Sequence, residues 1–465
     1  MDDLHNASLE ILEKIGMVIL EDTCFRLLED AGAEVNPTDR LVKIPGHLIN
    51  EGLAKVPKGA RIHYGRKPEY DFKTGDRLCF RGGTQGPYVL DLDTGIHRPA
   101  TRRDLENLVR LLDAMDCIQA VMFPCSPSDI PAEFLSQQMA KVTLENTAKP
   151  IGVVAYGRKS ARAVIEMAAI VTGGMEELTR RPIMQVLCEP ASPLKLDHRQ
   201  GENLVEFARH NLPIEMASMP AMCSTAPATL AGTIAQVNAE HLCMILIAQL
   251  VNQGTPVSLN ACTGCMDPRT GTNSYGALER VLLNAAVAQL WRSLYGVETY
   301  VSAALTDSKT HDEQAGYERM MNMLLPAFVG VDMVTTLGYL ESYLTISCEQ
   351  VAIDNEIASM ILHILDGVEV NEETLAMDVI RKVGPKHHFL AEKHTLKHVS
   401  ELFIPKLANR NTRAEWTRAG EKDIARVASD TAKRILEAHR PEPLEKDIRE
   451  KLRKMAGQIA ADSAN

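Results

Sequence analysis

Residues 183–219 read IMQVLCEPASPLKLDHRQGENLVEFARHNLPIEMASM and contain one complete repeat of the pattern that indicates the fold. A short apolar run, Ile183–Cys188, is followed by an amphipathic helical stretch and then by a second apolar run, Ile214–Ser218. Apolar runs of this length predict buried strands, and two such strands joined through a helix predict a parallel strand–helix–strand unit.

The same alternation extends from about Leu78 to Asp366, and each β-rich run in it is followed by a helical stretch. Eight such units over roughly 290 residues predict an α/β fold, the TIM (β/α)8 barrel, whose catalytic groups lie in the loops after the strands. A doubly wound open sheet is the alternative, although no GxGxxG follows any of the runs. The predicted strands are Leu78–Arg81, Ile118–Phe123, Ile151–Ala155, Ile183–Cys188, Ile214–Ser218, Pro256–Asn260, Thr299–Ala303 and Asp332–Leu337.

The segments on both sides of the barrel have a different pattern. Residues 1–75 predict short helices and turns, an N-terminal helical segment before a barrel domain at 76–370. In residues 371–465 acids and bases recur at helical spacing, which predicts a C-terminal helical appendage. Inside the first barrel unit, the stretch PYVLDLDTG (87–95) predicts an inserted hairpin with its turn at Asp-Thr-Gly.

The composition excludes several classes of function. The 465 residues carry a net charge of -11 without a block of like charges, so we expect no nucleic acid partner. The first residues are acidic, which argues against a signal peptide, and apolar runs such as Met244–Val251 are too short to span a membrane. Ten cysteines, mostly embedded in apolar runs, indicate a reducing compartment. We therefore expect a cytoplasmic protein that binds no membrane.

Polar and aromatic side chains follow the predicted strands, at the end where a TIM barrel carries its active site. Acidic and aromatic groups together suit a methylated cation, because a quaternary ammonium is attracted to an aromatic face and has no hydrogen bond to satisfy. Only 5% of the residues are aromatic, so several tyrosines near strand ends are informative, although each one alone is also consistent with packing. The candidates are Tyr156, Glu189, Met219, Asn260, Asp307, Tyr339, Glu341 and Tyr343.

Two other patterns raise the question of a metal. Cys262-Thr-Gly-Cys265 has the spacing of a zinc ligand pair, but no second His or Cys pair lies near it, and a structural CxxC is the simpler interpretation. The histidine-rich stretch His387–His398 falls in the polar appendage, where histidines more often cover or cap helices. We therefore predict no metal site.

A longer motif connects the chain to a known family. The stretch STAPATLAGTIAQVNAEH (224–241) resembles the segment of the trimethylamine methyltransferase family in which a Thr-Ala-Pro turn opens a long helix. Four further stretches resemble the family in the same order, so the similarity covers nearly the whole chain. They are PYVLDLDTG (87–95), TDSKTHDEQAGYE (306–318), LGYLESYLT (337–345) and HFLAEKHT (388–395).

The resemblance implies a methyl acceptor outside this chain. Members of the family are similar in fold to the predicted barrel and methylate cob(I)alamin, giving methylcobalamin, on a separate corrinoid protein. That protein is the implied partner and carries the cofactor. No DxHxxG-like cobalamin motif occurs in this sequence, so we expect no tightly bound cofactor in the chain itself. We also expect a homo-oligomer.

The resemblance also narrows the methyl donor. Archaeal trimethylamine enzymes of the family carry pyrrolysine near the stretch that corresponds to Thr299–Lys309, where this chain has only standard residues. A quaternary ammonium needs no such activation, because it already leaves as a neutral amine. The implied substrate is therefore a small quaternary amine, with glycine betaine first and carnitine, γ-butyrobetaine, proline betaine and choline open.

The implied reaction is an in-line displacement on a methyl carbon, without proton transfer. Placement and electrostatics then matter more than acid–base catalysis. We expect Glu189, Asp307 and Glu341 to face the cation and Tyr156 and Tyr339 to form aromatic walls, with a capping or rim salt-bridge role as the alternative for each carboxylate. Two other functions stay open: a zinc-dependent methyltransferase using Cys262/Cys265 and a non-catalytic betaine-binding barrel.

Overall fold

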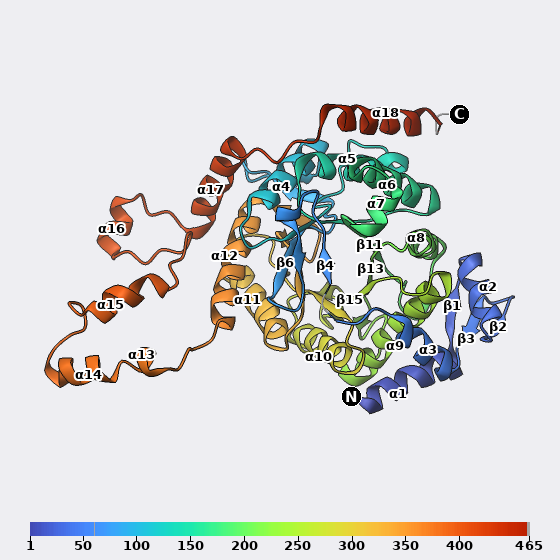
Figure 1. Cartoon of the computed structure of the whole chain (residues 1–465), viewed down its shortest axis with the longest axis horizontal. Helices are drawn as coiled ribbons and strands as arrows, with labels where there is room; N and C mark the ends of the chain where they lie inside the picture. Colours follow the sequence, from blue (N-terminus) through green and yellow to red (C-terminus); the bar gives the residue numbers. More distant parts are fainter. Residues whose placement is uncertain (60, 463–465) are drawn as a thin grey trace.

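The computed structural model describes residues 1–59 and 61–462, and its centre is a closed barrel of parallel strands (Figure 1). Each strand pairs with the next one along the chain, and the last closes the barrel on the first by pairing Met333 with Cys79. The predicted TIM barrel is confirmed, and the strand bounds differ from the predicted ones by no more than two residues. The strands are β6 (Cys79–Gly82), β9 (Ala120–Met122), β10 (Ile151–Val153), β11 (Met184–Cys188), β13 (Ile214–Ser218), β15 (Val257–Ala261), β18 (Glu298–Ser302) and β19 (Met333–Leu337).

Helices follow the strands and surround the barrel, which buries both faces of the sheet. Asp and Thr side chains begin several of them: at α4, Thr101 and Asp104 form a reciprocal capping box. The helices are α4 (Arg102–Ala114), α5 (Leu135–Asn146), α6 (Arg158–Thr172), α7 (Met175–Arg180), α8 (His198–Arg209), α9 (Leu230–Val251), α10 (Leu278–Leu294), α11 (Glu313–Phe328) and α12 (Cys348–Leu365).

Helix α9 is the 22-residue helix opened by the Thr-Ala-Pro turn, and it is long and apolar enough to cross a membrane by length and composition. Within the described chain, however, 89% of its most apolar window is buried inside the protein, as in a core helix. Helices α1 (Asp2–Glu10) and α3 (Gly46–Lys55) pack against it. The N-terminal segment therefore covers a helix that would otherwise expose an apolar face.

The N-terminal segment contains the predicted helices and also a small sheet that the sequence did not indicate. Strands β1 (Met17–Ile19), β2 (Glu34–Asn36) and β3 (Leu41–Lys43) lie between α1, α2 (Asp22–Asp30) and α3. The sheet is completed by β12 (Lys195–Leu196), which comes from the loop after barrel strand β11. Strands of two or three residues are too short to show a period-two pattern, so no sequence signal marks them.

Two hairpins modify the ends of the barrel. The predicted hairpin is confirmed as β7 (Tyr88–Leu90) and β8 (His97–Pro99), and the Asp91 side chain accepts the backbone N–H of Thr94 in its turn. A second hairpin, β4 (Ile62–His63) with β5 (Phe72–Lys73), lies at the opposite end, where its side chains reach the first residues of β18. It closes the N-terminal end of the barrel.

After α12 the chain leaves the barrel in a segment, residues 367–422, that we call the arm. Figure 1 shows the arm in orange to red, extending away from the body at the left. The chain then returns in α17 (Ile424–Ala438), which packs on α12 and α4, and ends in α18 (Lys446–Asp462), which packs on α5 and α6. The arm contains the short helices α13 (Glu372–Leu375), α14 (Met377–Val383), α15 (Lys393–His398) and α16 (Arg413–Arg418).

A buried ion pair joins the last two barrel helices to the barrel. Arg319 on α11 donates to Asp354 on α12 at 2.6 Å, and both side chains are fully buried. Asp354 also accepts the backbone N–H of Gly338, directly after β19, at 2.6 Å and the amide of Gln350 at 2.9 Å. One carboxylate thus connects two helices and the end of the last strand.

We expect Asp354→Asn to destabilise the fold by about 3–5 kcal/mol, because it leaves the Arg319 guanidinium buried without a counter-charge. Urea denaturation followed by circular dichroism measures the change. Asp378→Asn is the matched control, since it removes an exposed ion pair with Arg381 in the arm and should leave the midpoint unchanged. Equal midpoints for both variants would contradict a structural role for Asp354.

Candidate functional site

A cavity of about 360 Å³ opens at the carboxyl ends of the barrel strands. Side chains from the strands form its floor, and loops that follow them form its walls. This is the end where TIM barrels carry their active sites, and the volume suits a small organic ligand. Its lining residues are Arg81, Thr84, Gln85, Pro87, Val154, Leu187, Glu189, Gln200, Glu215, Ala217, Met219, Asn260, Cys262, Tyr275, Ser302, Ser342, Tyr343 and Leu344.

The floor of the cavity is a buried ion pair between Arg81 at the end of β6 and Glu215 on β13. Both terminal nitrogens of the Arg81 guanidinium donate to the two Glu215 oxygens, and both side chains are almost completely buried. Asn260 and Gln185 also donate to this carboxylate, at 2.6 and 3.0 Å. Side chains from four strands therefore meet at the Glu215 carboxylate, and these contacts fix the position of the floor.

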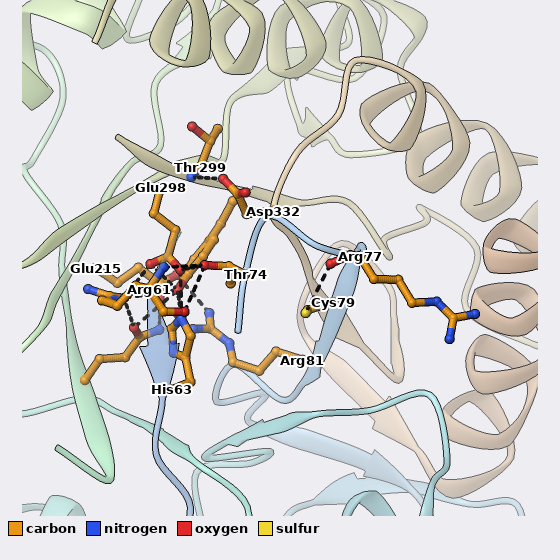
Figure 2. Close-up of polar contacts among 12 residues, drawn as sticks. Arg61, His63, Thr74, Arg77, Cys79, Arg81, Glu215, Glu298, Thr299 and Asp332 are labelled. Atoms are coloured by element: carbon orange, nitrogen blue, oxygen red, sulfur yellow. Dashed lines mark hydrogen bonds and ion pairs between the residues drawn. The ribbon is translucent and has the colours of Figure 1, made fainter. Parts of the chain in front are cut away.

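Below the floor, the β4–β5 hairpin supplies a second set of charges (Figure 2). Arg61 and His63 both reach Glu298 at the start of β18, at 2.5 and 2.7 Å, and Thr74 donates to the same carboxylate at 2.6 Å. Burial favours a high pKa for Glu298, but the Arg61 and His63 side chains lower it to about 2. Tyr300, which accepts from Arg61 at 3.2 Å, connects this set to the middle of the barrel.

These pairs balance charge in the barrel interior. Arg61 neutralises Glu298, and Arg81 neutralises Glu215. Glu189, which follows β11 and lines the cavity, adds a further carboxyl group above them. Its side chain has no hydrogen bond or ion pair within residues 1–59 and 61–462, and only its backbone N–H is engaged, with the Gln200 side chain at 3.3 Å.

The lack of a counter-charge affects the pKa of Glu189. Burial, and then the nearby negative charge of Glu215, raise the pKa of Glu189 to about 7. A group at such a value holds its negative charge weakly unless a cation is bound beside it. The cavity therefore presents one carboxylate that lacks a counter-charge, which is a property of a cation-binding site.

One wall of the cavity is aromatic. The rings of Tyr275 and Tyr343 meet edge to face with centroids 4.8 Å apart. The Tyr343 hydroxyl lies 2.7 Å from the Cys262 sulfur, so the polar end of the ring is engaged, and both rings line the cavity. Met219 adds a polarisable side chain to the lining.

Four of the eight residues singled out from the sequence line this cavity, namely Glu189, Met219, Asn260 and Tyr343. The other four lie elsewhere. Tyr339 is fully buried behind the wall, where its hydroxyl donates to the Pro124 carbonyl at 2.5 Å and accepts the Thr84 N–H. Tyr156 lies at the rim and donates to Gln85 at 3.1 Å.

Asp307 and Glu341 bind loop donors and are not among the described residues that line the cavity. Asp307 accepts the backbone N–H groups of Tyr275 and Gly276, at 2.8 and 3.0 Å, and the hydroxyls of Ser274 and Ser342. Glu341 accepts from Thr345 at 2.6 Å and lies 3.3 Å from His97. Asp307 thus connects the loops that carry Tyr275 and Tyr343. A direct contact of either carboxylate with a ligand stays a prediction.

The two metal patterns do not gather ligands: in the described chain, no group of three or more His, Cys, Asp and Glu side chains is placed to hold a metal ion. Cys262 faces Tyr343, whereas Cys265 lies on β16 (Gly264–Met266) beside Met222. Burial raises the pKa of Cys262, so its thiol form is favoured. In the arm, His398 contacts Glu373 and Glu401, as helix-surface histidines do.

Several residues that line the cavity were not predicted from the sequence. Glu215 carries a detectable signal, since a carboxylate inside the apolar run Ile214–Ser218 needs a buried partner. Arg81 gives the same signal at the end of the first strand. Tyr275 gives none, because a long loop separates it from the end of β15 and only the fold returns it to the cavity.

We expect Asp307→Asn to act through the loops, because the amide cannot accept from all four donors. The tyrosine wall would shift, raising KM about tenfold or more while kcat changes less. Steady-state kinetics and a melting curve measure both effects. Asp267→Asn is the control, because that carboxylate caps an exposed turn through Arg269. If Asp307→Asn instead lowered kcat alone at an unchanged melting temperature, a direct catalytic role would replace this one.

Known proteins are similar to this chain in sequence and in fold. The family model for trimethylamine methyltransferase (MTTB) matches residues 1–461. The chain is 35% identical to trimethylamine methyltransferase MttB of Desulfitobacterium hafniense (strain DSM 10664 / DCB-2), covering 97% of this chain and 90% of that protein. It is 34% identical to the glycine betaine methyltransferase of strain Y51, covering 98% and 95%. The crystal structure of the Methanosarcina barkeri monomethylamine methyltransferase MtmB has the same fold, with a TM-score of 0.52, 13% identity and coverage of 93% and 92%. The chain belongs to the trimethylamine methyltransferase family and is a methyltransferase.

Proposed function

We propose that this methyltransferase takes a methyl group from a small quaternary amine, with glycine betaine as the first candidate, and passes it to cob(I)alamin on a separate corrinoid protein. The observation that carries the proposal is Glu189, a carboxyl group in the cavity without a counter-charge. A quaternary ammonium supplies that charge permanently and needs no hydrogen bond, which matches a site with one unpaired carboxylate, two tyrosine rings and a methionine.

The rest of the lining supports a betaine over a simple ammonium ion. Gln200 turns its carboxamide oxygen to the Glu189 backbone, which leaves its NH₂ group to donate to a ligand carboxylate. Gln85 also lines the cavity, but its carboxamide contacts the Tyr156 hydroxyl and the Met139 sulfur. The glycine betaine methyltransferase among the relatives is consistent with this assignment.

The size of the cavity supports an external methyl acceptor. A volume of about 360 Å³ holds a small amine but not a corrin ring. A corrinoid presented at the mouth by a partner would supply a strongly nucleophilic metal centre. The residues of this chain would hold the ammonium against Glu189 and the tyrosine wall, orient one methyl group to the mouth and exclude water. No proton has to move, and the amine departs neutral.

A panel of methyl donors tests the proposal. The purified chain is mixed with cob(I)alamin and glycine betaine, carnitine, γ-butyrobetaine, proline betaine, choline or trimethylamine, and methylcobalamin is followed by absorbance. We expect a betaine to be turned over faster than trimethylamine, because a quaternary ammonium already leaves as a neutral amine, whereas a tertiary amine must first become cationic. Trimethylamine turnover equal to that of the best betaine would refute the substrate assignment. Absence of any methyl transfer, with betaine binding retained, would favour the non-catalytic barrel.

We expect kcat/KM for the quaternary amine to fall about tenfold per pH unit as the pH drops below about 7. The pKa of Glu189 is raised in the free enzyme, so its charge is present above about pH 7 and lost below it. Glu189→Gln should lower kcat/KM by about 10- to 100-fold at pH 8 and remove this pH dependence.

Glu166→Gln, at an exposed position on α6, is the matched control and should keep both the rate and the pH profile. A Glu189→Gln enzyme that retains the wild-type profile would show that another group binds the cation.

A further inference from the structure

The arm, residues 367–422, exposes large apolar side chains to a degree unusual for a folded segment. Leu390 is 84% exposed, Leu396 78% and Ile404 76%. Val368, Leu375 and Leu402 are exposed as well, and these side chains recur on successive short helices and turns of one segment. Large apolar side chains exposed in such number on one segment mark an interaction site.

The arm is held away from the body, because the point where it returns to the body is anchored. This point, residues 406–408, we call the root of the arm. The Glu356 carboxylate on α12 accepts three consecutive backbone N–H groups, from Lys406, Leu407 and Ala408, at 2.6 to 2.8 Å. The Phe403 ring also packs on His363, with centroids 5.6 Å apart. Because the arm is held at its root and at the end of α12, it projects from the body rather than folding over it (Figure 1).

The part of the arm between these anchors contacts mainly itself. Lys382 pairs with Glu392 at 2.6 Å, and Lys397 and His398 both pair with Glu373. All the side-chain hydrogen bonds recorded for residues 369–401 in the described chain have both partners in that range. The charged side chains of this part therefore pair within the arm, while the apolar ones are not covered.

Beside the root of the arm lies a complementary surface. A groove of about 260 Å³ runs between α11 and α12, and its apolar lining includes Met320, Ile353, Ile357 and Met360. Ala408 at the root of the arm forms one edge of the groove. Each copy of the chain therefore carries a projecting apolar arm. Next to the root of the arm lies an apolar groove that this arm does not fill.

Charge favours an acidic occupant, and the body of a second copy is acidic. The arm contains ten Lys and Arg against eight Asp and Glu, and four of the fourteen histidines, whereas the whole chain has 50 Lys and Arg against 61 Asp and Glu. The arm is thus slightly basic on a strongly acidic body. Its attraction is to a surface such as the body of another copy.

We propose that two copies of this chain exchange arms, each arm lying over the α11–α12 groove of the other copy. Because the root of the arm and the groove are adjacent, a two-fold axis beside them makes both contacts at once. The exchange covers the apolar side chains of both arms and closes the assembly. It does not depend on which amine the barrel demethylates.

Sedimentation velocity on the full chain tests the exchange. We expect the wild type to sediment as a dimer or a larger even-numbered assembly. The double variant L390D/L396D should sediment as a monomer, and because both positions are exposed, its circular dichroism should be unchanged. Met360→Glu, in the groove, should have the same effect from the other side of the contact.

Leu282→Glu is the matched control, because it places the same charge at an exposed leucine on α10 outside the groove and should leave the assembly intact. A monomeric wild type would overturn the proposal and assign the arm to a different protein. An assembly that persists in the arm variant or in the groove variant would overturn it as well.

Discussion

The bidentate ion pair between Arg81 and Glu215 organises the barrel interior, because side chains from four strands meet at it. Two charges inside a closed sheet are costly unless each finds a partner, and here the first strand supplies one and the fifth the other. Asn260 and Gln185 occupy the remaining carboxylate positions. A polar floor is thereby fixed across the barrel, and the cavity above it has a defined depth.

The same requirement explains the hairpin at the opposite end. Glu298 begins the seventh strand inside the barrel, and the β4–β5 hairpin brings Arg61 and His63 to it. With Glu215 and Glu298 paired, Glu189 is left as the carboxylate of the cavity lining that has no ion pair within residues 1–59 and 61–462. A methyl donor that carries its own positive charge completes the balance, which connects the packing of the barrel to the proposed chemistry.

Loops at the carboxyl ends of the strands give the site its shape. Asp307, which follows β18, holds the segments that carry Tyr275 and Tyr343, so the aromatic wall is built from three different loops. Tyr339 has a comparable role inside the wall, since its hydroxyl connects the segments at Pro124 and Thr84. Residues that resemble ligand contacts in the sequence can thus act one step away from the ligand.

The barrel could be predicted from the sequence, because each buried strand and amphipathic helix is encoded in a local pattern of apolar residues. The sequence also marked the rim, and Glu189, Asn260, Met219 and Tyr343 followed from their place after strands. Tertiary structure alone decided which rim residues face the cavity, because a side chain one or two positions beyond a strand points inward or into a loop according to the turn that follows. It alone decided that Tyr275 reaches the site, and that Arg81 and Glu215 meet, because these contacts join strands and loops far apart in the chain and no local pattern records them.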